Sequence, residues 1–182
     1  MPDIAVSAWF HAHTHPVLTQ IMLVITHAHS TLAICLLALG IGLWLLRRRR
    51  FWWLLALILS VPGGLILNAA VKQAIRRARP HFDDPLLTLT SYSFPSGHTA
   101  GATVFYGFLT VLLLAHVRET RWRVAIVAGA SGMVVLVALS RVYLGVHYLS
   151  DVIGAIVEGA IWLALCLTAV RALWRRSTIG SN

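Results

Sequence analysis

Long apolar runs separated by short polar segments account for most of the chain. A helix needs about 20 predominantly apolar residues to cross the hydrocarbon core of a bilayer. Five runs approach or exceed that length: 17–46, 51–75, 96–117, 124–140 and 151–173. Only helices or closed barrels can satisfy every backbone amide in lipid, and these runs lack the period-two alternation of barrel strands. The pattern therefore predicts an all-α fold, a polytopic transmembrane helix bundle of about five to six spans.

The N-terminal end of the chain has a different pattern. Residues 1–16 are mixed and rich in histidine, which predicts an interfacial segment with a short helix built on four apolar side chains: Ile4, Val6, Trp9 and Phe10. The run at 17–46 is longer than one span requires, so we expect it to be tilted or to begin in the interface. We expect a single membrane domain over residues 1–182, with the helical bundle at 17–175.

The basic residues fall into two groups on opposite sides of the bundle. The chain has a formal net charge of +9, but its Lys and Arg lie in short clusters between apolar runs, which argues against nucleic-acid binding. One side has ten of them: Arg47, Arg48, Arg49, Arg50, Arg118, Arg121, Arg123, Arg171, Arg175 and Arg176. The other side has five: Lys72, Arg76, Arg77, Arg79 and Arg141. By the positive-inside rule the larger group faces the cytoplasm. The smaller group then faces the periplasm or exterior of a bacterial inner (cytoplasmic) membrane.

Two segments on that outer side have features suited to phosphate. Lys72 and Arg79 are seven residues apart, so they share a helix face. For a phosphate group, the lysine offers a mobile point charge and the arginine a planar, bidentate pair of donors. Ser96 is a suitable N-cap, Gly97 lets a ligand approach the free amides of a helix start, and His98 in the first turn can protonate a leaving oxygen. Each segment alone has a simpler interpretation: a snorkelling basic cluster for the first, and an ordinary helix start for the second.

A third segment, containing Arg141, His147 and Asp151, offers a nucleophile. His147 and Asp151 are four residues apart, so on a helix the carboxylate lies beside the imidazole. A carboxylate bonded to one ring nitrogen fixes the tautomer and leaves the other nitrogen free to attack phosphorus. The alternative is a structural ion pair at the start of the last span. Taken together, the three segments supply the cations, donors, nucleophile and acid that phosphoryl transfer requires.

The three segments closely resemble the signature of the type-2 phosphatidic acid phosphatase family. The matching motifs are Lys72-x6-Arg79-Pro80, then Pro95-Ser96-Gly97-His98, then Ser140-Arg141-x5-His147-x3-Asp151. The resemblance covers about residues 60–165 and implies a metal-independent phosphatase acting on lipid phosphates or diphosphates. It implies that His147 is the nucleophile, Asp151 its partner and His98 the general acid. It implies five phosphate-binding residues: Lys72, Arg79, Ser96, Gly97 and Arg141. Many members of the family have six spans, whereas five runs are counted here, so either the first 30 residues contain a re-entrant or sixth helix or this small bundle lacks it.

The resemblance leaves the substrate open. An outward-facing site in a compact bacterial chain favours undecaprenyl pyrophosphate, with phosphatidylglycerol phosphate and phosphatidic acid as alternatives. A lipid-to-lipid phosphotransferase would use the same site and differ only in the acceptor. An anion transporter would explain the basic residues but not the paired histidine and aspartate. A vanadium haloperoxidase would have a similar site, but a short membrane chain disfavours it. Because His98 must first donate and later accept a proton, we expect a bell-shaped pH dependence.

Some residues stay outside this scheme. Five histidines alternate in two groups: His11, His13 and His15, then His27 and His29. Residues i and i+2 do not share a helix face, so structural or interfacial roles are favoured, and neither a metal nor a cofactor is expected. Glu158 lies inside the last span, seven residues after Asp151, where a supporting ion pair or hydrogen bond is favoured over catalysis. The oligomeric state is left open.

Overall fold

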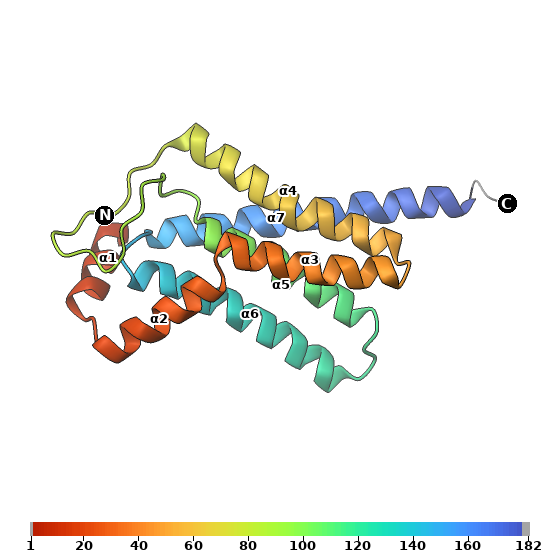
Figure 1. Ribbon diagram of the computed structural model, residues 1–182, viewed down its shortest axis with the longest axis horizontal. Helices are drawn as coiled ribbons and strands as arrows, with labels where there is room; N and C mark the ends of the chain where they lie inside the picture. The colour runs from red at the N-terminus through yellow and green to blue at the C-terminus, as the bar shows by residue number, and fades with distance from the viewer. Residues whose placement is uncertain (1, 180–182) are drawn as a thin grey trace.

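A computed structural model describes residues 2–179 and contains only helices within that range. The helices are α1 (Pro2–Ala12), α2 (Pro16–Ala28), α3 (Thr31–Arg47), α4 (Phe51–Ile75), α5 (Gly97–Leu114), α6 (Thr120–Tyr143) and α7 (Leu149–Ile179). The long helices run side by side along one axis, and the loop between α4 and α5 lies at one end of the bundle together with α1 (Figure 1). The predicted all-α bundle is confirmed.

The centre of the bundle is α5. It contacts α3, α4, α6 and α7, and half of its membrane-length window is buried, against a third or less in the other long helices. Its buried side chains include Val104, Phe105 and Phe108, which join Val61 of α4 and Ile34 of α3 in the main apolar core. A span that other helices cover on most sides needs no lipid-facing stripe. The segment containing Ser96, Gly97 and His98 therefore enters the middle of the bundle rather than its edge.

Small residues let neighbouring helices approach α5 closely. A Cβ atom at Gly64 of α4 would lie 3.0 Å from Val104, and one at Gly159 of α7 would lie 3.0 Å from Thr103. Helix pairs in lipid associate through such close packing, because hydrocarbon tails are as apolar as the helices themselves. These contacts fix α4 and α7 against α5, and all three helices have an end at the candidate site.

The run at 17–46 is two helices rather than one. Helices α2 and α3 meet at His29 and Ser30 with a bend of 48°, and the Ser30 hydroxyl accepts a hydrogen bond from the Ala33 amide at 3.3 Å, which caps α3. The run at 17–46 is therefore broken near residue 29, and its expected tilt or start in the interface stays a prediction. Four described helices are long and apolar enough to cross a bilayer, and the bent pair counted as a broken span makes five.

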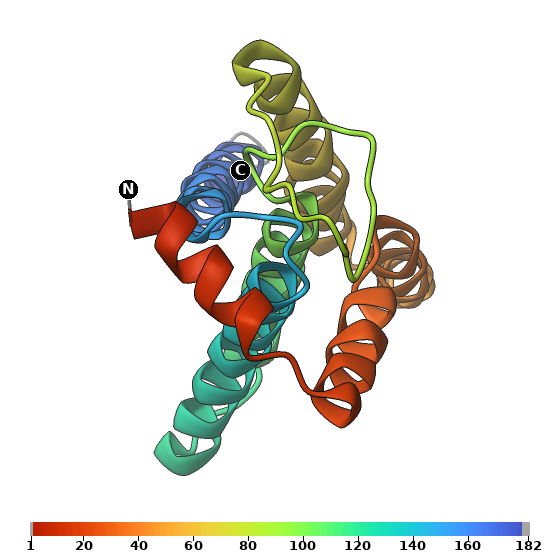
Figure 2. The same ribbon diagram turned by 90° about the vertical axis from the view of Figure 1, so that its left-hand side faces the viewer.

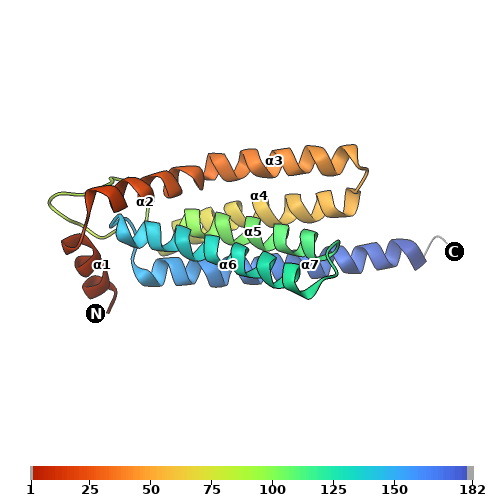
Figure 3. The same cartoon turned by 90° about the horizontal axis from the view of Figure 1, so that it is seen from below.

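The N-terminal segment is helical, as predicted, and lies across the end of the bundle (Figures 2 and 3). Val6 and Phe10 pack on the ends of α6 and α7, whereas Ile4 and Trp9 are more than half exposed. This division is typical of an amphipathic helix with one face on protein and the other in the interface. Helix α1 thereby borders the end of the bundle where the three candidate segments meet.

Candidate active site

The three candidate segments come together at one end of the bundle (Figure 2). Lys72 lies in the last turn of α4, and the residue that follows this helix, Arg76, adopts the left-handed conformation with φ of 52°. The chain then loops through residues 77–95 and returns to Ser96, the N-cap of α5. The end of α6 at Arg141, the turn containing His147 and the first turn of α7 complete the site.

His147 and Asp151 form a buried pair, although not within one helix. His147 precedes α7 and Asp151 lies in its first turn, and Gly145, with φ of +69°, makes the bend that leads into this segment. His147 Nδ1 lies 3.4 Å from Asp151 Oδ2, and the two side chains are 2% and 0% exposed. The sequence was right about the pairing and wrong about its helical basis.

Three other donors converge on the Asp151 carboxylate. Oδ2 accepts from the Ser93 hydroxyl and from the Tyr148 amide at 2.9 Å, while Oδ1 accepts from Arg77 Nη1 at 2.7 Å. Ser93 Oγ also lies 3.5 Å from His147 Nδ1. A buried carboxylate is costly unless it is paired and hydrogen-bonded, and here both oxygens are satisfied. The carboxylate is therefore held in one orientation beside the imidazole.

Arg77 links this carboxylate to helix α1. Its Nη2 donates to Asp3 Oδ2 at 2.9 Å, and its guanidinium lies 4.3 Å from the centre of the Tyr148 ring. Although burial opposes its charge, the two carboxylates of Asp3 and Asp151 raise the pKa of Arg77 above its ordinary value. Sequence reasoning counted Arg77 only as one of five outer cations and did not single out Asp3 or Ser93.

The geometry selects one tautomer of His147. With its Nδ1–H directed at Asp151, the ring carries its lone pair on Nε2, where Arg79 Nη1 lies at 3.2 Å. Burial lowers the pKa of His147 to about 4, with Arg79 and Arg141 acting in the same direction and Asp151 opposing them. The imidazole is therefore neutral at physiological pH, which is the form that can act as a nucleophile.

Backbone carbonyls of the α4–α5 loop position the two cations of the first segment. Lys72 Nζ donates to the carbonyls of Pro95 at 2.7 Å and Tyr92 at 2.9 Å. Arg79 donates to the Ser91 carbonyl of this loop and to the Val146 carbonyl between α6 and α7, each at 2.6 Å. These bonds explain why the loop folds back over the end of the bundle: its carbonyls need donors, and the two cations supply them.

Arg141 is the most deeply buried cation of the chain, at 1% exposed. Its Nη1 donates to the Thr26 hydroxyl of α2. Nε and Nη2 are buried without any hydrogen-bond partner among the described residues. No carboxylate of the described chain forms an ion pair with it, whereas Arg77 binds two. A buried guanidinium with unpaired donors is costly, and such donors suit an anionic ligand.

The start of α5 completes the arrangement. Ser96 is fully buried and its hydroxyl accepts a hydrogen bond from Thr99 Oγ1 at 3.1 Å, so its own proton stays available as a donor. A Cβ atom at Gly97 would lie 3.4 Å from the Asn68 amide oxygen. His98 is partly buried and lies in the first turn of α5, directly after Ser96 and Gly97. All eight residues predicted for the site thus lie at the same end of the bundle.

Glu158 is a neighbour of the site through Asn68. Asn68 Nδ2 donates to Glu158 Oε2 at 2.8 Å, so the expected hydrogen bond within the bundle is present. The alternating histidines separate: His11 bonds to Asp84, His13 to the Trp9 carbonyl and His29 to the Tyr106 hydroxyl. Residues 2–179 contain no group of three or more His, Cys, Asp or Glu that could hold a metal ion.

Comparison with known proteins identifies the family to which the chain belongs. The family model described as the PAP2 superfamily matches residues 52–175. The chain belongs to the PAP2 superfamily. The match includes all three candidate segments and leaves α1, α2 and α3 outside it. Membership favours a phosphatase over the anion transporter and agrees with the family resemblance found in the sequence.

Two sequence relatives and one solved structure illustrate the similarity. Phosphatidylglycerophosphatase B of Bacillus subtilis is 37% identical over 142 residues, which cover 76% of this chain and 68% of that protein. The undecaprenyl-diphosphatase BcrC of the same organism is 30% identical over 154 residues, covering 82% of this chain and 74% of its own. The crystal structure of a transmembrane PAP2-type phosphatidylglycerolphosphate phosphatase from Bacillus subtilis superposes with a TM-score of 0.82 at 31% identity, covering 96% of this chain and 85% of that one. The chain is therefore a bacterial membrane protein and a lipid phosphatase.

Proposed function

We propose that the chain hydrolyses the terminal phosphate of a membrane lipid through a phosphohistidine on His147. The buried His147–Asp151 pair carries this proposal, because its geometry leaves Nε2 with a lone pair among the cations of the site. Nε2 attacks phosphorus, the bond from phosphorus to the lipid oxygen breaks, and His98 gives its proton to the departing oxygen. Asp151 stabilises the positive charge that develops on the ring.

The second half of the reaction frees the histidine. Water attacks the phosphohistidine, His98 accepts a proton from that water, and the bond from Nε2 to phosphorus breaks to release inorganic phosphate. In both steps the charge on the phosphoryl oxygens is stabilised by Lys72, Arg79 and Arg141, together with the amides at the start of α5. This assignment gives a function to the unpaired donors of Arg141.

Phosphatidylglycerol phosphate is the first candidate substrate, because a phosphatidylglycerophosphatase shows the higher identity of the two relatives compared above. Undecaprenyl pyrophosphate, which the sequence alone favoured, remains the second candidate, supported by the similarity to an undecaprenyl-diphosphatase. The excess of arginine at the opposite end of the bundle supports a site facing the periplasm or exterior of the inner membrane.

Phosphate release from purified protein with a chelator present distinguishes the candidates. We expect release from phosphatidylglycerol phosphate with a higher kcat/KM than from undecaprenyl pyrophosphate or phosphatidic acid, and no loss on metal removal. A higher kcat/KM for undecaprenyl pyrophosphate would instead indicate that this diphosphate is the substrate. Transfer of phosphate to an added lipid, with little release of free phosphate, would indicate a phosphotransferase. A requirement for a divalent metal would contradict the histidine mechanism.

The low pKa of His147 leads to a prediction about acid pH. An ordinary histidine has a pKa of about 6.5. Because burial lowers the pKa of His147 to about 4, its ring stays neutral at pH values well below 6.5. We expect the His147 imidazole to remain mostly neutral at pH 5.5, where an unperturbed histidine is about 90% protonated. Nitrogen-15 NMR of histidine-labelled protein in micelles measures this directly, with the His147 signal assigned by its loss in His147→Asn. A protonation midpoint near 6.5 would show that burial does not keep the nucleophile neutral.

A further inference from the structure

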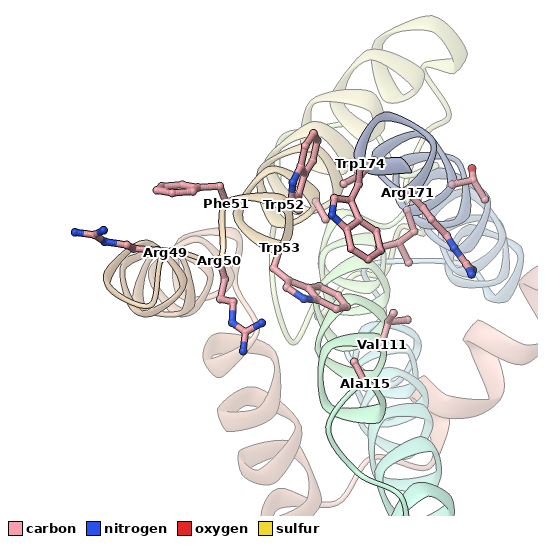
Figure 4. A pocket seen from close by; sticks show the side chains of 13 residues that line it. Arg49, Arg50, Phe51, Trp52, Trp53, Val111, Ala115, Arg171 and Trp174 are labelled. Carbon is pink, nitrogen blue, oxygen red and sulfur yellow. The ribbon is translucent and has the colours of Figure 1, made fainter. Parts of the chain in front are cut away.

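A groove lies at the end of the bundle opposite the phosphatase site, between α4, α5 and α7 (Figure 4). Its volume is about 920 Å³, within the range typical of small-molecule pockets. Tryptophans form much of its wall: Trp52 and Trp53 from the start of α4, and Trp174 from α7. Trp52 and Trp174 are 37% and 49% exposed, so the groove opens sideways toward lipid. Tryptophan is enriched at the level of the lipid headgroups.

Arginine side chains flank this apolar wall. Arg50 lies beside Trp53 and Arg171 beside Trp174, so that the two cations stand on opposite sides of the hollow (Figure 4). Neither forms an ion pair with any described residue. Glu119 is the one acidic residue in the connections at this end, and it already binds Arg121 at 2.8 Å. Within residues 2–179, therefore, no acidic side chain neutralises the cations of the groove.

We propose that this groove binds one anionic phospholipid from the leaflet at that end of the bundle. The anionic headgroup lies between the flanking Arg50 and Arg171, and an acyl chain lies along the tryptophans. Basic pockets between transmembrane helices recognise anionic headgroups in this way, and an interfacial cation contributes about 1 kcal/mol to such binding. Helix α4 separates this groove from Lys72 by most of its 25 residues, roughly 30 Å at 1.5 Å per residue. The groove is thus independent of the substrate site.

Binding of phosphatidylglycerol to the purified protein in micelles tests this proposal. This lipid is a phosphodiester, so it carries no terminal phosphate for the enzyme to remove. We expect a one-to-one complex by native mass spectrometry and a higher melting temperature, with phosphatidylcholine giving neither. Arg50→Gln and Arg171→Gln should each raise the apparent Kd about fivefold, Arg171→Lys should stay near the wild type, and Trp174→Leu should weaken binding.

Two matched controls lie at the same end of the bundle and outside the groove. Arg118→Gln removes an equivalent charge from the α5–α6 connection, and Trp122→Leu removes an exposed tryptophan from α6; both should bind as the wild type does. Phosphate release at the other end of the molecule reports that each variant is folded. If Arg118→Gln weakens binding as much as Arg171→Gln, the attraction is diffuse and the proposal fails. Equal binding of phosphatidylcholine would overturn it as well.

Discussion

Replacing His147 with alanine will abolish phosphate release while leaving the protein folded. Loss of a nucleophile in a covalent mechanism reduces the rate by about 10⁴-fold or more, because no other group can take over the attack. The geometry offers no substitute, since His98 lies on α5 and has no carboxylate partner comparable to Asp151. Inorganic phosphate measured under saturating substrate gives kcat, and the melting temperature reports the fold.

A covalent intermediate should disappear together with the activity. Wild-type protein mixed rapidly with phosphate-labelled substrate and stopped in alkali should carry label on His147, whereas the alanine variant should carry none. His116→Ala makes the same chemical change just beyond the opposite end of α5, where the ring bonds to the Leu112 carbonyl far from the site, so its activity should be unchanged. Full activity in His147→Ala would refute the assignment of the nucleophile.

Much of this site could be predicted from the sequence because its residues lie at ends of apolar runs. A span must begin and end at the interface, so the positions of Lys72, Ser96 and Arg141 along the chain already placed them on one side of the membrane. The four-residue spacing of His147 and Asp151 also predicted a carboxylate next to an imidazole, although the turn before α7, rather than a helix shared by both residues, brings them together. The N-terminal helix was predictable in the same way, from apolar residues set among polar ones.

The supporting groups could not be predicted, because they come from a loop that has no periodicity. Ser93 reaches Asp151 across 58 residues, and Arg77 connects the same carboxylate to Asp3, near the N-terminus. No spacing rule relates such positions, since the path of the 77–95 loop is set by the cations that bind its carbonyls. The break at Ser30 was missed for a similar reason: a serine within an apolar run can be read as tolerated in a span, although here it caps a new helix.

At Arg141 the requirements of stability and of function conflict. Its guanidinium is 1% exposed, and two of its nitrogens have no partner among the described residues. The penalty for burying an uncompensated ion is several kcal/mol, whereas its one hydrogen bond, to Thr26, contributes about 1–3 kcal/mol. The burial penalty exceeds the contribution of that bond, so the Arg141 side chain opposes folding. It therefore makes sense as a donor group prepared for phosphate rather than as a structural element.

Arg141→Met should consequently lose activity without losing stability. We expect kcat/KM to fall by about 10²–10³-fold, the usual cost of removing a preorganised donor to a developing charge, while the melting temperature stays the same or rises. Arg141→Lys should recover only part of the activity, because an ammonium cannot reproduce a bidentate fork. Leu144→Ala, at a neighbouring position that is also 1% exposed, should behave in the opposite way, losing about 2–5 kcal/mol of stability. If Arg141→Met instead unfolds the protein as Leu144→Ala does, the guanidinium holds the bundle together and its unpaired donors are not evidence for a phosphate site.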